Sequence, residues 1–123
     1  MATPMDKWQA QQAFWSSFGF KAYNELTVPE DAQLPYITYQ LVDGCLDGNL
    51  TASGSLYMRG TTWTKICQTV SDMEKVVDRQ IPIVGGVMKV RKPIANFAQP
   101  LNDPSDTMIR RMVLMVEIEF LTE

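Results

Sequence analysis

The chain has 123 residues, of which 46% are hydrophobic and 20% charged; this suits one folded domain over residues 1–123 and argues against a disordered chain. Its formal net charge of −3 and the scatter of its basic residues disfavour a nucleic-acid-binding domain, which usually carries a basic face. No apolar run is long enough for a membrane-spanning helix, and the polar N-terminal stretch is unlike a signal peptide. We therefore expect a soluble product made in the cytosol.

The first half of the chain predicts one helix followed by a hairpin. Apolar residues recur on one face over residues 5–18, and Gly19 is well placed to end that helix. Residues 21–34 carry a proline and several acidic side chains, which predicts an extended loop. Residues 36–43 are rich in β-branched and aromatic side chains, and residues 50–59 alternate cleanly. These two strands should pair as an antiparallel hairpin.

The second half begins with the strongest helical pattern. Apolar residues keep the spacing of an amphipathic helix over residues 63–80, and Pro82 is expected to end it. A short strand follows at 87–92. Residues 93–105 contain three prolines and predict a loop, with a brief strand near 96–99.

The last predicted element, residues 107–121, is a strand of about 14 residues, well beyond the usual five or six. We therefore expect it to continue past its own sheet or to be paired by a strand from outside the chain. The expected order is α-β-β-α-β-β. This order gives an α+β fold, with a mainly antiparallel sheet and helices packed on one face.

Residues that support catalysis are few. The sequence contains no histidine, which removes every Ser-His, Cys-His and His-metal arrangement. The two cysteines, Cys45 and Cys67, are too few for a disulfide framework and lack the spacing of metal ligands. Cys67 fits a small core residue on the apolar face of its helix. We expect no enzyme activity, no metal and no cofactor.

Acidic side chains gather in two turns and on the last strand. The run at 43–49 superficially resembles a calcium loop, but the spacing of its acids is wrong and the closing glutamate is missing. Residues 102–106 are typical of a capped turn. Glu117 and Glu119 lie on one strand face, within reach for acid–base work. Without neighbours that shift one pKa, they fit a polar edge or an interface better.

Several short segments stand in a characteristic order along nearly the whole chain. They are Phe14-Trp-Ser-Ser-Phe-Gly-Phe-Lys-Ala-Tyr23, Thr27-Val-Pro-Glu-Asp31, Leu34-Pro-Tyr-Ile-Thr-Tyr39, an alternating strand with Tyr57 and Arg59, Thr62-Trp63 opening a helix, Asn96-Phe-Ala-Gln99, Asp103-Pro-Ser-Asp106 and the strand 110–121. Their order resembles the small neck and tail proteins of long-tailed bacteriophages, and above all the tail terminator (tail completion) proteins.

This resemblance implies a tail-terminator-like α+β subunit that closes into a ring, usually a homohexamer. The ring is a structural virion protein: it caps the growing tail tube, ends tube polymerisation and offers its other face to the head connector. The implied partners are the major tail tube protein and a head–tail connector or stopper protein. The implied location is the tail and neck of the virion, after assembly in the host bacterial cytoplasm. No enzyme activity, cofactor or catalytic residue is carried over.

The residues favour assembly independently of the resemblance. An overlong strand is a natural donor for sheet extension between subunits, and eight methionines with 10% aromatic residues fit adaptable interfaces. We hypothesise that residues 107–121 and the loops 43–51 and 93–106 carry the contacts with subunits and partners. The candidate contact residues are Asp43, Asp47, Asn49, Asn102, Asp103, Arg110, Arg111, Glu117 and Glu119.

Three alternatives stay open. The chain could be a head–tail connector or stopper of the same neck, a role that the sequence barely separates from a terminator. It could be a small acidic ligand-binding domain or enzyme that uses Asp43 and Asp47. A regulatory protein that binds nucleic acid is a third alternative, which the acidic charge disfavours.

Overall fold

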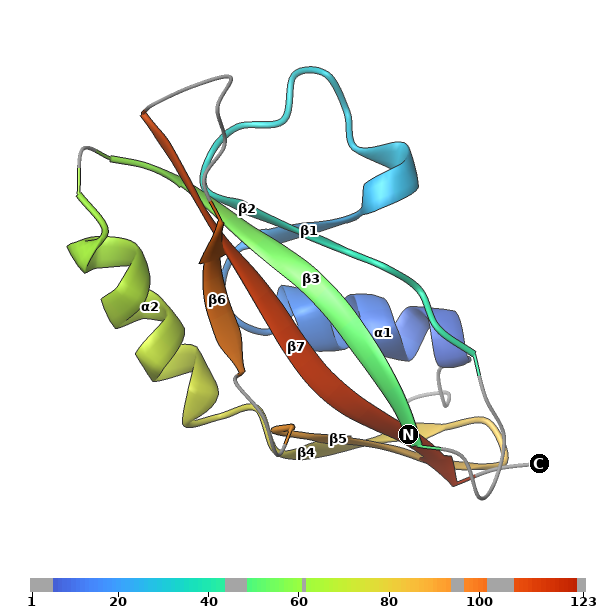
Figure 1. Ribbon diagram of the computed structural model, residues 1–123. Coiled ribbons are helices and arrows are strands. Elements are labelled where there is room, and N and C mark those ends of the chain that lie inside the picture. Colours follow the sequence, from blue (N-terminus) through green and yellow to red (C-terminus); the bar gives the residue numbers. More distant parts are fainter. Residues whose placement is uncertain (1–5, 44–48, 61, 94–96, 102–107, 122–123) are drawn as a thin grey trace.

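The computed structural model describes residues 6–43, 49–60, 62–93, 97–101 and 108–121 (Figure 1). The described residues form two α-helices, one 3₁₀ turn and seven strands in a single curled, mostly antiparallel sheet. In chain order the elements are α1 (Lys7–Ser16), β1 (Lys21–Asn24), η1 (Glu25–Thr27), β2 (Tyr36–Tyr39), β3 (Asn49–Arg59), α2 (Thr64–Glu74), β4 (Arg79–Ile83), β5 (Gly86–Arg91), β6 (Ala98–Leu101) and β7 (Ile109–Leu121). The fold is α+β, as the sequence predicts. The expected order α-β-β-α-β-β is incomplete, because it omits β1, β4 and β6, although the brief strand expected near residues 96–99 overlaps β6.

Helix α1 begins at a capping box and ends beside a glycine. The Asp6 carboxylate accepts a hydrogen bond from the Gln9 backbone N–H at 2.8 Å, and the Gln9 side chain accepts one from the Asp6 N–H at 3.1 Å. Gly19 follows with a φ of 93°, a left-handed conformation that glycine adopts without strain. These signals place the helix at Lys7–Ser16, inside the expected range.

The strand order in the sheet is β1-β2-β3-β7-β5-β4, and β6 also pairs with β7. The pair β1–β2 is parallel, whereas the other pairs are antiparallel. The expected hairpin of the second and third strands is confirmed, with Tyr36 opposite Tyr57.

Strand β7 is a central strand of the sheet. On one side β3 pairs with it from Ile109 to Glu119; on the other side β6 pairs with residues 111–114 and β5 with residues 117–121. Between those two segments, the Met115 N–H donates to the Phe97 carbonyl at 2.7 Å. The expectation that the last strand outruns its own sheet is therefore wrong. Its length is matched by two short strands that lie one after the other along the same side.

Two further expectations are corrected by strand pairing. The predicted loop over residues 21–34 begins with β1, whose four residues pair with β2. Helix α2 ends at Glu74, and the last residues of the predicted helix 63–80 belong to β4. Pro82 therefore lies in an edge strand, the position in a sheet where its missing N–H is tolerated.

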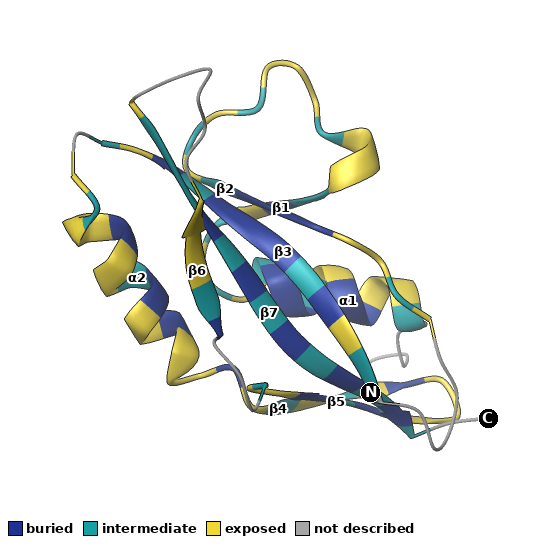
Figure 2. Cartoon of the chain, viewed as in Figure 1, coloured by how far each residue is buried: buried dark blue, intermediate teal, exposed yellow. Residues whose placement is uncertain are grey.

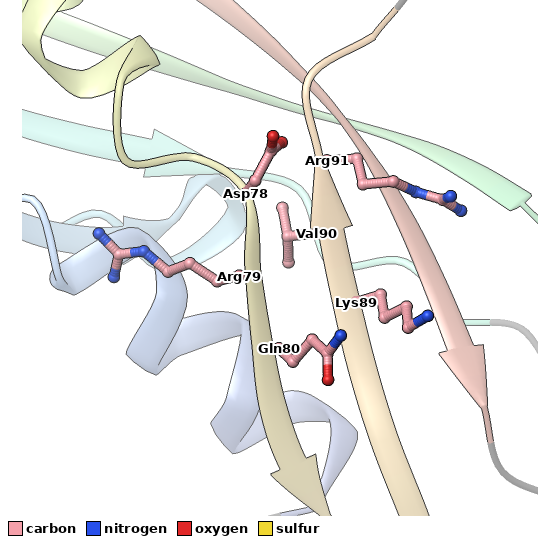
Figure 3. A pocket seen from close by; sticks show the side chains of 6 residues that line it. All are labelled: Asp78, Arg79, Gln80, Lys89, Val90 and Arg91. Carbon is pink, nitrogen blue, oxygen red and sulfur yellow. The ribbon is translucent and has the colours of Figure 1, made fainter.

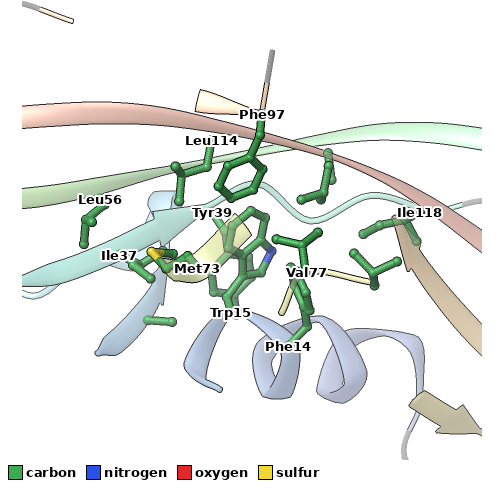
Figure 4. Packing of buried hydrophobic residues seen from close by; sticks show 14 of the residues in the cluster. Phe14, Trp15, Ile37, Tyr39, Leu56, Met73, Val77, Phe97, Leu114 and Ile118 are labelled. Carbon is green, nitrogen blue, oxygen red and sulfur yellow. The ribbon is translucent and has the colours of Figure 1, made fainter. Parts of the chain in front are cut away.

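The core lies between the helices and one face of the sheet. Along β7, buried side chains from Met112 to Phe120 alternate with partly exposed ones (Figure 2). Trp15 of α1, Met73 of α2 and Leu114 of β7 all belong to the buried cluster (Figure 4). The two helices thus contribute to one core on one face, as predicted. Cys67 departs from the prediction, because it is exposed on α2 and lies outside this core.

The sheet curls around α1. This helix contacts both β1 and β4, although these strands stand at opposite ends of the strand order. The Arg79 guanidinium of β4 lies over the Phe14 and Phe18 rings, 6.0 and 5.3 Å from their centroids. At the centre of the curl, the Trp15 indole lies so close to Gly54 of β3 that an added Cβ would be 2.9 Å from Trp15 Cζ3. Glycine in this strand allows the close approach of helix and sheet.

Candidate interaction surface

The side of the sheet away from the core carries the strongest candidate for a functional surface. We call it the outer face: the odd-numbered side chains of β3 from Thr51 to Arg59 and of β7, with the side chains opposite them in β1, β2 and β5. The uncovered face of an antiparallel sheet is normally polar. Here it includes Tyr57, Val113 and Met115, which are only partly exposed. This face therefore presents more apolar surface than solvent contact alone would require.

Three tyrosines from three adjacent strands line up on the outer face, and we name Tyr23, Tyr36 and Tyr57 the tyrosine ladder. The Tyr23 and Tyr36 ring centroids are 5.9 Å apart with planes at 73°, and those of Tyr36 and Tyr57 are 5.2 Å apart at 30°. Arg111, opposite Tyr57 in the register, places its guanidinium 5.3 Å from the Tyr57 centroid. Its Nε donates a hydrogen bond to Ser55 Oγ at 3.0 Å. Each ring is thus held by neighbours before any partner binds.

The middle member of the tyrosine ladder, Tyr36, has a raised pKa. Burial raises the pKa of Tyr36 above its ordinary value, and the nearby phenols of Tyr57 and Tyr23 raise this pKa further. A phenol with a raised pKa stays protonated at neutral pH. Like any neutral phenol, the Tyr36 hydroxyl can donate as well as accept a hydrogen bond without bringing a charge to the surface.

The other end of the outer face carries acidic side chains of β7, and basic side chains of β5 in the same chain lie opposite them. In the register of β5 and β7, Lys89 is opposite Glu119 and Arg91 is opposite Glu117. Arg91 Nη2 also lies 2.5 Å from Glu119 Oε2. Of the predicted contact residues, Arg111, Glu117 and Glu119 thus share this face, and both glutamates have basic neighbours of their own chain.

Of the remaining six predicted contact residues, two lie elsewhere, one has no described side chain and three are not described. Arg110 is on the opposite face of β7, with its guanidinium 5.3 Å from the Trp63 ring centroid. Asp43 is exposed beyond β2 and pairs with Lys7 at 3.1 Å. Asn49 begins β3 opposite Glu119 in the register. Three predicted residues lie outside the described part of the chain: Asp47, Asn102 and Asp103.

A hollow of about 400 Å³ at the β4–β5 hairpin lacks the arrangement of a ligand site (Figure 3). Arg79 points to one side of the hairpin, whereas Lys89 and Arg91 point to the other. Small-molecule sites need polar groups that converge on one point. Over the described residues, no three His, Cys, Asp or Glu side chains are grouped to hold a metal, and no helix is long and apolar enough to cross a membrane.

The tyrosine ladder was not among the predicted contact residues. Tyr36 and Tyr57 lie in strands that the sequence predicts to pair, so a correct register would have placed them side by side. Tyr23 lies in the stretch predicted as a loop. The aromatic residues of both hairpin strands were a signal that could have pointed to the tyrosine ladder. The pairing register of the strands, which places those residues side by side, could not be read from the sequence.

Comparison of the chain with protein families, with curated proteins and with solved structures gives no significant match. Over the described residues, the chain is an α+β domain whose helices pack on one sheet face and whose other face is partly aromatic and partly exposed.

Proposed function

We propose that this chain is a structural assembly protein of the tail-terminator type, which forms a ring on the end of a phage tail tube. The ring ends tube growth and provides the surface to which the head connector joins. The order of sequence segments supports the class of protein. The observation that carries the proposal is the outer face, where apolar and aromatic side chains of the described residues stay partly exposed.

The layout of the outer face supports a contact with another protein. Val113 and Met115 lie at neighbouring positions of β7, opposite the small residues Ser55 and Ser53. The tyrosine ladder lies on one side of this apolar centre and the charged pairs of β5 and β7 on the other. An apolar centre with a polar rim is the usual anatomy of a protein interface, in which aromatic residues, methionine and arginine are enriched. We assign the tube contact to this face.

The tube contact is tested with one variant and a matched control. Met115→Lys places a charge at the apolar centre, where the side chain is only partly exposed, so the monomer should still fold. Gln68→Lys adds the same charge to the exposed side of α2. Binding to the tail tube protein of the same phage, measured by interferometry, should fall at least about tenfold for Met115→Lys and stay unchanged for Gln68→Lys. Equal tube binding by the two variants would remove the outer face from the proposal.

Ring formation and the terminator role are tested on the unmodified chain. Sedimentation alone and with tube subunits should reveal a closed oligomer, and added protein should fix the length of assembling tubes. A pull-down against the tail tube protein and against the head connector protein separates the roles. A terminator should bind the end of the tube and stop its growth. A neck protein of the connector or stopper type should instead bind the head connector protein and leave tube growth unchanged. A chain that stays monomeric with and without tube subunits would overturn the proposal.

A further inference from the structure

The outer face is basic although the chain as a whole is acidic. The chain has 11 basic and 14 acidic residues and a formal net charge of −3. By strand register, the described side chains of the outer face include five basic and two acidic ones. They are Lys21, Arg59, Lys89, Arg91 and Arg111, with Glu117 and Glu119. Positive charge gathered on one face attracts partners of the opposite sign.

The surplus of positive charge lies at one end of the outer face. At the β5 end, two of the basic side chains are opposite the two glutamates, so the charges there balance. The other end holds the tyrosine ladder with Lys21, Arg59 and Arg111, and we call these six residues the aromatic–basic end. This end has no acidic member. Within the described chain, none of its three basic side chains forms an ion pair.

Two hollows border the aromatic–basic end, and they differ in charge. The first, of about 620 Å³, is lined by Lys21 and Tyr23 and also by Asp31, whose carboxylate offsets the charge of the lysine. The second, of about 380 Å³, is lined by Arg59, Tyr36 and four uncharged residues. The charge that a partner must match therefore lies on the arginine side of this end.

Arg59 and Arg111 are spaced to share an anionic partner. They hold diagonal positions on β3 and β7, because Arg59 is opposite Ile109 and Arg111 is opposite Tyr57. Diagonal positions of adjacent strands are about 7–8 Å apart. Two guanidinium groups this close repel each other, and a carboxylate bound beside them would relieve the repulsion. Arg111 is already oriented, since its Nε donates to Ser55 Oγ at 3.0 Å, which lowers the entropy lost on binding.

The packing of the tyrosines favours carboxylates over nucleic-acid bases. Strands β2, β3 and β7 are adjacent, so Tyr57 lies between Tyr36 and Arg111 (Figure 1). The Tyr57 ring centroid is 5.2 Å from that of Tyr36 and 5.3 Å from the Arg111 guanidinium. A ring between two such neighbours has little free face on which a base could stack. Its hydroxyl and the guanidinium groups are hydrogen-bond donors, which suit carboxylate oxygens.

We infer that the aromatic–basic end binds an acidic segment of the tail tube protein, an inference that rests on the proposed tube contact. This end is continuous with the apolar centre at Val113 and Met115, so one partner can cover both. The β5 end is balanced within the chain and does not attract carboxylates in the same way. The acidic segment is therefore drawn to one end of the face, which fixes the orientation of the subunit on the tube.

Interferometry with the tail tube protein of the same phage tests the acidic contact. Arg59→Gln combined with Arg111→Gln should weaken binding at least about tenfold in about 0.1 M salt, chiefly through slower association. Arg59→Gln alone changes an exposed side chain, so the fold should be kept and binding should weaken at least about threefold. Raising the salt to about 1 M shortens the screening length from about 10 to 3 Å, which should weaken the unmodified chain more than the double variant.

The matched control removes the same charge from another surface. Lys65 and Lys75 are exposed, on α2 and directly after it, and Lys65→Gln combined with Lys75→Gln should bind the tube as the unmodified chain does. Suppose that the arginine double variant binds as tightly as this control, whereas Met115→Lys loses binding. The acidic contact would then be wrong and the tube contact would stand. An unmodified chain that fails to bind the tube protein would overturn both.

Competition with probes of known chemistry separates an acidic protein segment from a nucleic acid. A glutamate-rich peptide and a single-stranded thymidine oligonucleotide of equal charge are each added to the chain bound to tube protein. The peptide should displace the tube protein at least as well as the oligonucleotide does. Stronger displacement by the oligonucleotide, or displacement by neither probe, would overturn the inference.

Discussion

Replacing Gly54 by alanine tests the contact on which the curl of the sheet depends. A Cβ at this position would lie 2.8 Å from the Thr38 carbonyl oxygen and 2.9 Å from Trp15 Cζ3. The first neighbour is backbone of the adjacent strand, and the second is the fully buried indole of α1. Neither can move without shifting β2 or α1. The added methyl group should therefore force both elements apart.

The expected magnitude follows from the cost of overpacking. One extra carbon in a well-packed core costs about 1–3 kcal/mol. The entropy of unfolding is roughly 0.26 kcal/mol/K for a chain of 123 residues, so the melting temperature should fall by about 4–12 °C. Gly60→Ala is the matched control, since a Cβ there has its nearest neighbour at 3.6 Å. This control should be neutral or slightly stabilising.

Thermal unfolding and urea unfolding, both followed by circular dichroism, measure the two variants against the unmodified chain. We expect a lower midpoint for Gly54→Ala, with a similar slope, and an unchanged or higher midpoint for Gly60→Ala. If both variants unfold at the midpoint of the unmodified chain, Trp15 is not packed on the Gly54 backbone as described, and the account of the curl fails.

Three further predictions concern the buried amide, the tyrosine ladder and the charged end of the outer face. Gln11→Leu should lower the free energy of unfolding by about 2–4 kcal/mol, because the buried amide exchanges hydrogen bonds of 2.8 and 2.9 Å with the Val42 backbone; a loss in urea unfolding below about 1 kcal/mol would contradict this. The raised pKa of Tyr36 means that the folded state holds this proton more tightly than the unfolded chain, so the stability it contributes is present below about pH 10 and falls as the pH rises further. Tyr36→Phe should reduce that alkaline loss, and an unchanged dependence of urea midpoints on pH would count against it. Exchanging Glu117 and Glu119 for lysine should cost no more than about 2 kcal/mol, because these pairs are partly exposed, yet weaken ring formation or tube capping; unchanged particle size and tail length would refute their assignment as contact residues.

The charged end of the outer face also changes how that last experiment is interpreted. Glu119 bonds to Arg91 within the chain, so charge reversal disturbs an internal pair as well as a possible contact. A comparison with Met115→Lys separates these effects, since Met115 lies opposite Ser53 and makes no charged pair. Loss of assembly in the charge-reversal variant alone would then point to the charged rim, and loss in both would point to the whole face.

The sequence by itself determined the elements whose signals are local. The apolar periodicity over residues 5–18 and the glycine after the helix located α1, and the alternation along β3 located that strand. The α+β class followed from the hydrophobic periods of helix and strand, because each period can be recognised within a short run of consecutive residues. The absence of histidine, which limits the available chemistry, is likewise a property of the sequence alone.

Only the tertiary structure decided which strands are neighbours. β1, β4 and β6 have four or five residues each, too few for a clear period of their own, so each is defined by its hydrogen bonds to a partner strand. The length of β7 was visible in sequence, but its central position was not, since β5 and β6 share one of its sides. The tyrosine ladder depends on the register of three strands. The pairing register of two strands depends on which side chains the core can bury together, and the sequence of one strand alone does not show it.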